Sequence, residues 1–132
     1  MEITTSWHSY PKIHAVGNNF VKDIFLDDVI IEEKLDGSQF SFGIFNGVIK
    51  CRSKGVELDM DHPEKMFNAA VEMVKSISSK LKDGWTYRGE YLKSPNHNTL
   101  KYNRTPNNFV MIFDINDGHE SYLSYEKKQE EA

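Results

Sequence analysis

The dipeptide Asn46-Gly47 is the feature of the sequence that most constrains the fold. A type I′ turn needs positive φ at both central residues, and asparagine followed by glycine adopts this conformation readily. The run before the dipeptide alternates polar residues with large apolar ones, which are Phe40, Phe42 and Ile44. This pattern predicts an antiparallel hairpin with strands at 39–45 and 48–52, and therefore a fold that contains an antiparallel sheet.

Three more runs are predicted to be strands of the same sheet, at 28–35, 85–92 and 109–115, because they are rich in aliphatic and aromatic residues. A helix is predicted at 63–82, where apolar residues recur at steps of three and four: Met66, Ala70, Val74, Ile77 and Leu81. The expected class is α+β, an antiparallel sheet with this helix packed on one face.

The remaining segments are predicted to be irregular. Residues 93–108 are polar and contain two prolines, which is typical of a loop. In this loop Lys93, Lys101 and Arg104, with Tyr102 among them, form a candidate patch for phosphates and a stacked base. Residues 126–132 are highly charged and are expected to be a frayed end.

Composition narrows the class of protein. A chain of 132 residues makes one domain at most, and 39% hydrophobic residues predict a folded globule. The net charge of −4 gives no general attraction to nucleic acid, so any such contact must be a local patch. One cysteine, Cys51, and no long apolar run predict a cytoplasmic chain without a membrane span. The five histidines show no metal-ligand spacing, so we expect no structural zinc site and assign no residue as a metal ligand.

Lys34 is the candidate reactive group, because it follows an apolar run and precedes the turn residues Asp36 and Gly37. A lysine amine attacks phosphorus only when neutral, and a pKa of about 10.4 leaves roughly one molecule in a thousand or fewer neutral at pH 7. Partial burial, or a cation such as Arg52 or Lys54, would favour the neutral amine. The alternative is a simple ion pair between Lys34 and a neighbouring acid.

Four strings of residues resemble, in order, motifs of the covalent nucleotidyltransferases, the superfamily of ATP-dependent ligases and mRNA capping enzymes. They are Lys-Leu-Asp-Gly at 34–37, Cys-Arg-Ser-Lys-Gly at 51–55, Tyr-Arg-Gly-Glu-Tyr-Leu at 87–92 and Phe-Val-Met-Ile-Phe-Asp-Ile at 109–115. The opening Ser-Tyr-Pro-Lys-Ile at 9–13 and the stretch 97–106 make the chain most similar to the phage-type ATP-dependent RNA ligases. The resemblance implies an ATP-grasp-like adenylation fold, here a single partial domain of residues 1–132.

The resemblance also implies roles for individual residues. Lys34 would form a lysyl-AMP intermediate, Arg52 would contact the nucleotide sugar or the polynucleotide end, and Glu90 would bind the ribose hydroxyls. Phe113 would stack on the purine, with plain core packing as the alternative. Glu33, Leu35 and Asp36 would complete the ATP site, and Mg²⁺ would accompany ATP. The expected nucleic-acid contacts are Arg52, Lys54, Lys101 and Arg104.

The implied function is an ATP-dependent polynucleotide ligase domain that seals 5′-phosphate to 3′-hydroxyl ends, with RNA favoured over DNA. No glutamate-glycine strand like motif IV and no paired-lysine strand like motif V follows Asp114. The chain would therefore be a fragment of a longer ligase that needs its missing C-terminal segment, depend on a second chain, or be impaired or inactive as it stands. The alternatives are a non-catalytic nucleotide or nucleic-acid binding module, and a fragment of a DNA ligase or a capping-type guanylyltransferase that prefers GTP.

Overall fold

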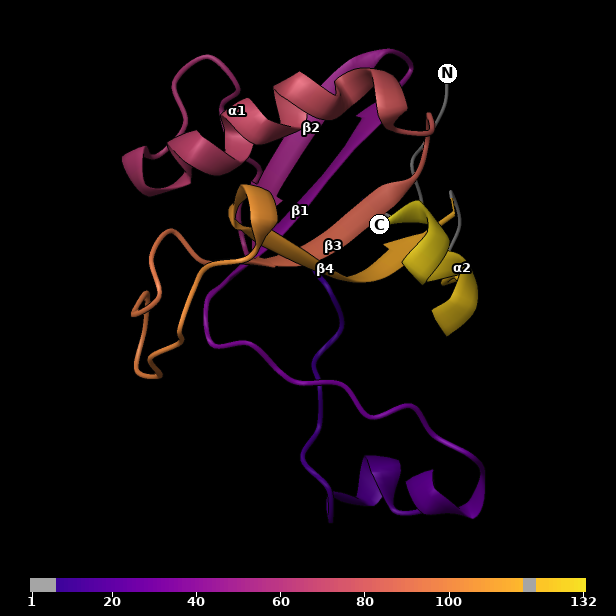
Figure 1. Ribbon diagram of the computed structural model, residues 1–132. Helices are drawn as coiled ribbons and strands as arrows, with labels where there is room; N and C mark the ends of the chain where they lie inside the picture. Colours follow the sequence, from indigo (N-terminus) through magenta and orange to yellow (C-terminus); the bar gives the residue numbers. More distant parts are fainter. Residues whose placement is uncertain (1–6, 118–120) are drawn as a thin grey trace.

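A single antiparallel sheet organises the computed structural model, which describes residues 7–117 and 121–132 (Figure 1). Its strands are β1 (Ser38–Phe45), β2 (Val48–Ser53), β3 (Thr86–Tyr91) and β4 (Val110–Asn116). They lie in the order β2-β1-β3-β4, and each neighbouring pair is antiparallel. The predicted α+β class and four of the five predicted strands are confirmed.

The β1–β2 hairpin forms as the sequence predicts. Asn46 and Gly47 have φ of 53° and 80°, and Phe45 pairs with Val48 across the turn. Both turn residues therefore lie in the left-handed region that a type I′ turn requires.

Replacing Gly47 with alanine is expected to lower the free energy of unfolding by about 1 kcal/mol, because a Cβ is disfavoured at this positive φ. The space around Gly47 is open, so no steric clash adds to this backbone effect. Urea unfolding would measure the loss. Gly55→Ala is the matched control, since Gly55 also has open space but no positive φ. Equal losses in the two variants would contradict the prediction.

One face of the sheet is covered by the helix α1 (Asn68–Ile77), which the short helices η3 (Lys65–Phe67) and η4 (Ser78–Lys80) extend at either end. The predicted helix at 63–82 is thus found at 65–80, and Pro63 lies before it. Phe67 stacks on Phe40 with ring centroids 5.8 Å apart, and this contact belongs to the main hydrophobic core. None of the helices in the described residues is long and apolar enough to cross a membrane.

The other face of the sheet is polar and carries a row of four side chains. Strand register aligns one residue from each strand in this row: Arg52, Ser41, Arg88 and Asp114. Arg88 is completely buried, and its guanidinium donates to Asn116 Oδ1 at 3.0 Å.

The N-terminal segment 7–10 lies across this polar face. The His8 carbonyl accepts a hydrogen bond from Arg88, and Tyr10 Oη donates to Asp114 Oδ2 at 2.6 Å. Burial, followed by the hydrogen bond to Asp114, raises the pKa of Tyr10. Trp7 packs against Phe45, with ring centroids 5.1 Å apart. Residues 7–10 therefore occupy the surface beside the polar row.

The prediction of a strand at 28–35 is wrong. This segment has no strand pairing, and the side chains of its apolar run 29–31 are exposed, with Ile31 at 86%. Both edges of β1 are taken by β2 and β3, so the preceding segment finds no free strand beside it. Acidic residues on both sides of its short apolar run also favour solvent.

Residues 11–34 instead project from the sheet (Figure 1). The far part of this projection carries two short helices, η1 (Asn19–Val21) and η2 (Ile24–Leu26). Several of its large apolar side chains are exposed, among them Phe20 and Leu26.

The expectation of a frayed C-terminal end is also wrong, since residues Tyr125–Glu131 form the helix α2 beside β4. Ser124 caps it by accepting a hydrogen bond from the Lys127 N–H. Lys128, only 5% exposed, donates to Glu32 Oε2 at 2.6 Å and to the Phe113 carbonyl at 3.1 Å. A charged sequence is therefore ordered here by one buried lysine that joins α2 to the segment before Lys34.

Candidate active site

The turn of residues 34–37, which we call the lysine turn, comes directly before β1 and packs against β3. The Gly37 N–H donates to Glu90 Oε2 at 3.0 Å, so the glycine and the glutamate of two separate motifs meet. Lys34 itself is exposed, so partial burial, one of the two ways considered for favouring its neutral form, does not apply. Its positive charge acts on both Asp36 and Glu90 and favours the ionised form of each carboxyl. The structure therefore brings Lys34, Asp36 and Glu90 together.

Glu90 is half-buried in the polar face, next to Met111 of β4 in the strand register. Burial raises the pKa of its carboxyl, while the Gly37 N–H and the charge of Lys34 partly oppose this rise. The ionised form of Glu90 thus depends on the Gly37 N–H and on Lys34. Carboxyls with pKa values shifted in this way are common in functional sites.

The loop of residues 93–108, which ends at the short helix η5 (Asn107–Phe109), holds the carboxylate of Asp36. The Leu100 N–H donates to Asp36 Oδ2 at 2.8 Å, and Asn98 Nδ2 approaches Asp36 Oδ1 at 3.5 Å. The Leu100 N–H is the main cause of a lowered pKa at Asp36, and the Thr99 N–H, the Asn98 amide and the charge of Lys34 act in the same direction. Asp36 is therefore a structural anchor of the lysine turn as well as a neighbour of Lys34.

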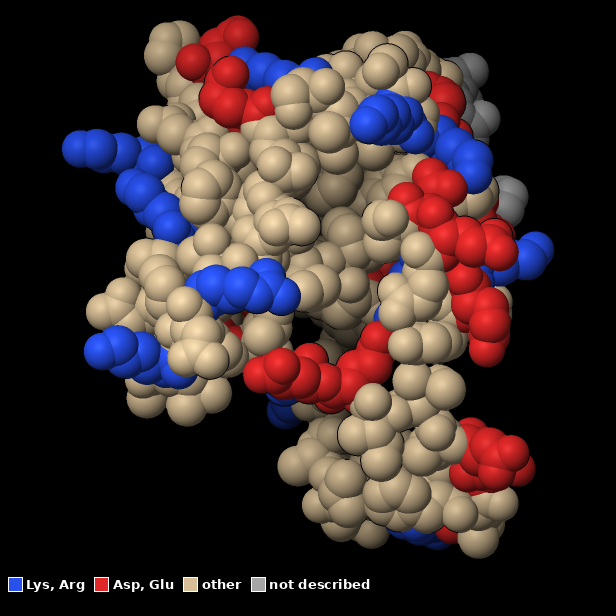
Figure 2. All heavy atoms as spheres, in the orientation of Figure 1, with Lys and Arg blue, Asp and Glu red and all other residues tan. Residues whose placement is uncertain are grey.

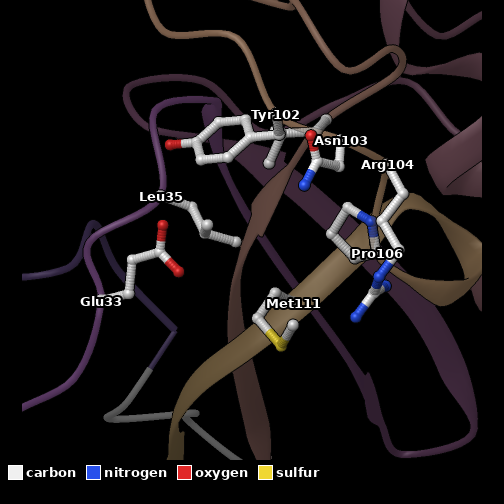
Figure 3. Close-up of a pocket in the computed structure, with 8 residues that line it drawn as sticks. Glu33, Leu35, Tyr102, Asn103, Arg104, Pro106 and Met111 are labelled. Carbon is white, nitrogen blue, oxygen red and sulfur yellow. The ribbon is translucent and has the colours of Figure 1, made fainter.

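A cavity of about 190 Å³ lies between the lysine turn, this loop and β4 (Figure 3). Its lining residues come from all three parts: Glu33, Leu35, Leu92, Tyr102, Asn103, Arg104, Pro106 and Met111. In Figure 3 the carboxylate of Glu33 and the guanidinium of Arg104 lie on opposite sides of Met111. The cavity is thus apolar at its floor and oppositely charged at its two sides.

Three of the predicted site residues line this cavity, namely Glu33, Leu35 and Arg104. Met111 was not among the predicted site residues, because an apolar residue in a predicted strand is expected to pack in the hydrophobic core. Only the strand register, which sets Met111 beside Glu90, reveals its place. Tyr102 was expected to stack on a base, which stays a prediction. In the structure its hydroxyl accepts a hydrogen bond from the Asp36 N–H at 2.8 Å.

Arg52 and Phe113 do not line the cavity. Arg52 donates to Ser9 Oγ at 3.2 Å and lies over the ring of Trp7, with 5.7 Å from Cζ to the ring centroid. Phe113 contacts Tyr10 edge to face, with ring centroids 5.0 Å apart. Both residues lie on the side of the sheet that residues 7–10 cover. Among the predicted residues, the structure thus separates Arg52 and Phe113, which contact the N-terminal segment, from those that line the cavity.

Charge is distributed unevenly around the cavity. Figure 2 shows basic side chains over the 93–108 loop at the lower left, where Lys93, Lys101 and Arg104 belong, and acidic side chains beside the hollow below the sheet. Lys54 is exposed at the end of β2, and its carbonyl accepts a hydrogen bond from Ser9. In residues 7–117 and 121–132, no three histidine, cysteine or acidic side chains gather as a metal site.

In a comparison with protein families, the family model described as RNA ligase matches residues 27–132. This range includes the lysine turn, Glu90, the 93–108 loop and every residue that lines the cavity. No curated protein and no solved structure matches the chain.

Proposed function

Because the chain belongs to the RNA ligase family, we propose that it is an ATP-dependent polynucleotide ligase domain with Lys34 as its nucleophile. The four-stranded sheet and α1 would form the front part of an ATP-grasp-like adenylation domain. RNA is the favoured polynucleotide, since the family match names RNA ligase.

The observation that carries this proposal is the cavity beside the lysine turn. Its floor of Leu35, Leu92 and Met111 suits the face of a nucleobase, while Glu33 and Arg104 offer an acceptor and donors to the polar edges of the base. Lys34 lies in sequence between the lining residues Glu33 and Leu35 but does not itself line the cavity. The proposal therefore requires the phosphates of the nucleotide to extend out of the cavity to the exposed amine. Glu90 lies under the same turn and is the candidate partner of the ribose hydroxyls.

The proposed reaction has three steps. Lys34 Nζ, after losing a proton to solvent, attacks the α-phosphorus of ATP, an N–P bond forms, and the P–O bond to pyrophosphate breaks. The AMP group then passes to a 5′-phosphate on the polynucleotide, which frees Lys34. A 3′-hydroxyl finally attacks that 5′-phosphate, AMP leaves, and the strand is sealed.

Positioning and charge neutralisation are the main tasks of the protein in such phosphoryl transfers. Lys101 and Arg104 on the loop, with Arg52 and Lys54 at the end of β2, are the candidate contacts for polynucleotide phosphates. Mg²⁺ would arrive with the phosphates of ATP, since the described residues gather no acidic cluster to hold it. We therefore assign Mg²⁺ no protein ligands.

A second candidate function is a non-catalytic nucleotide or nucleic-acid binding module. The placement of Arg52 and Phe113 under residues 7–10, away from the cavity, favours this alternative. Such a module would bind a nucleotide without forming a bond to it.

Incubation with ATP labelled at its α-phosphate, in the presence of Mg²⁺ and followed by a denaturing gel, tests the proposal. We expect a label that survives denaturation from ATP, and none from ATP labelled at the γ-phosphate. Labelling from GTP alone would instead assign the chain to capping-type guanylyltransferases. If neither nucleotide labels the chain but calorimetry detects ATP binding, the binding module is the correct description.

A further inference from the structure

The sheet leaves the lysine turn without support on its N-terminal side. Residues 28–36 form no strand, and Lys34 is exposed. On the N-terminal side, Glu32 is held by Lys128 of α2. On the C-terminal side, Asp36, Gly37 and Ser38 make hydrogen bonds, and most of these come from the loop of residues 93–108. The residues that follow the amine are therefore held largely by this loop.

Asn98 bridges two consecutive residues of the turn. Its Nδ2 donates to the Gly37 carbonyl at 2.7 Å and lies 3.5 Å from Asp36 Oδ1. The Leu100 N–H holds the other carboxylate oxygen of Asp36 at 2.8 Å. The backbone and the side chain of the turn are thus fixed from the same short stretch of the loop.

His97 holds the next residue along β1. Its Nδ1 accepts the Lys93 N–H at 3.1 Å, so the proton of the neutral ring lies on Nε2, which donates to Ser38 Oγ at 2.9 Å. This bond joins the start of the loop to the start of β1 and brings Asn98 to the turn.

Tyr102 connects the turn to the cavity. Its hydroxyl accepts the Asp36 N–H at 2.8 Å, while the same side chain lines the cavity. Figure 3 shows the ring extending from the loop toward the segment that carries Leu35. A ligand in the cavity and the backbone two residues from Lys34 would therefore touch the same aromatic side chain.

We propose that Tyr102 and Asn98 are positioning residues that hold the lysine turn in the conformation from which Lys34 attacks. This inference rests on the proposed function and goes beyond it, because it assigns the geometry of the nucleophile to the 93–108 loop. Neither side chain reacts. Each makes a hydrogen bond to the backbone of Asp36 or Gly37, just after Lys34. Misplacement of a reacting group by about 1 Å can slow a reaction on the order of a hundredfold.

The first test is Tyr102→Phe, which removes the hydroxyl and keeps the ring that lines the cavity. One lost hydrogen bond of about 1 kcal/mol predicts a labelling rate at saturating ATP that is roughly five- to tenfold lower. The ATP concentration for half-maximal rate should change less than about twofold, because the ring is retained. Tyr122→Phe is the matched control, since the Tyr122 hydroxyl has no hydrogen-bond partner in the described residues. It should label at the wild-type rate.

Hydrogen exchange of the Asp36 and Gly37 amides, measured by NMR, reports on the turn independently of labelling. In Tyr102→Phe the Asp36 amide should exchange faster, while the amides of the β1–β3 pairing stay protected. A second variant, Asn98→Ala, should accelerate exchange at the same turn and slow labelling to a similar extent. The thermal midpoint is recorded for each variant, so that global unfolding is recognised.

The outcomes separate this inference from the proposed function. If the wild-type chain takes label and both variants do so at the same rate, the positioning role is overturned and the ligase proposal stands. If the wild-type chain takes no label, the ligase proposal fails, and exchange alone decides whether the loop holds the turn. Unchanged exchange at Asp36 in both variants would overturn the inference in either case.

Discussion

Replacing Lys34 with alanine is expected to abolish the ATP-derived label, with a loss of at least about a thousandfold in rate, because the variant lacks the amine that forms the N–P bond in the proposed reaction. Stability should change little, since Lys34 is exposed. The measurement is the denaturing gel with α-labelled ATP, quantified over time.

Two variants sharpen the result for Lys34. Lys34→Arg keeps a positive charge near Asp36 and Glu90 but cannot act as a nucleophile at neutral pH, so it should also take no label. Lys22→Ala removes an exposed lysine from the projecting segment, between the short helices η1 and η2, and should label normally. Label retained by both Lys34 variants would show that the nucleophile is a different residue.

The second large effect is expected at Gly37. A Cβ built on Gly37 would overlap the Tyr91 carbonyl oxygen and lie 2.8 Å from Leu92 Cδ1. The carbonyl belongs to β3 and cannot move aside, so in Gly37→Ala the turn itself must shift away from the sheet. This shift would weaken the hydrogen bond from the Gly37 N–H to Glu90 and displace Lys34. We expect labelling to fall about a hundredfold.

Gly55→Ala is the control for Gly37→Ala, because nothing lies within 4 Å of a Cβ at Gly55. Both variants should be compared at equal folded fraction, established by circular dichroism. If Gly37→Ala labels as fast as Gly55→Ala, the close packing of the turn on β3 has no role in catalysis.

The sequence predicts the sheet well because its signals are local. Asn46-Gly47 determines the turn of the hairpin, and the strands at β3 and β4 follow from dense aromatic and aliphatic runs. The same reasoning fails at 28–35, because an apolar run becomes a strand only if it pairs with another strand. In the order β2-β1-β3-β4 both sides of β1 are taken, and the run does not pair with the outer edge of β2 or β4. Strand pairing depends on this order, which is not a local property.

The candidate site is predictable only in part for a similar reason. Motif resemblance identifies Lys34, Asp36 and Glu90, and the structure brings these three together. The role of the 93–108 loop depends on contacts between residues more than sixty positions apart, such as that of Tyr102 with Asp36. The composition of this loop predicts only that it is polar and irregular. No periodic pattern indicates which of its asparagines makes hydrogen bonds to the lysine turn.

Trp7 has a practical value that follows from its position. Its indole packs on Phe45, lies near the guanidinium of Arg52 and donates to Glu57 Oε1 at 3.0 Å, while the second tryptophan, Trp85, lies just before β3. Release of residues 7–10 would move one of the two indoles into water and leave the other in place. Intrinsic fluorescence, with Trp85 replaced by phenylalanine, would thus give an optical readout of the N-terminal segment alone. A substrate that displaces residues 7–10 to reach Arg52 would expose the Trp7 indole to water, and a red shift in emission would report its binding.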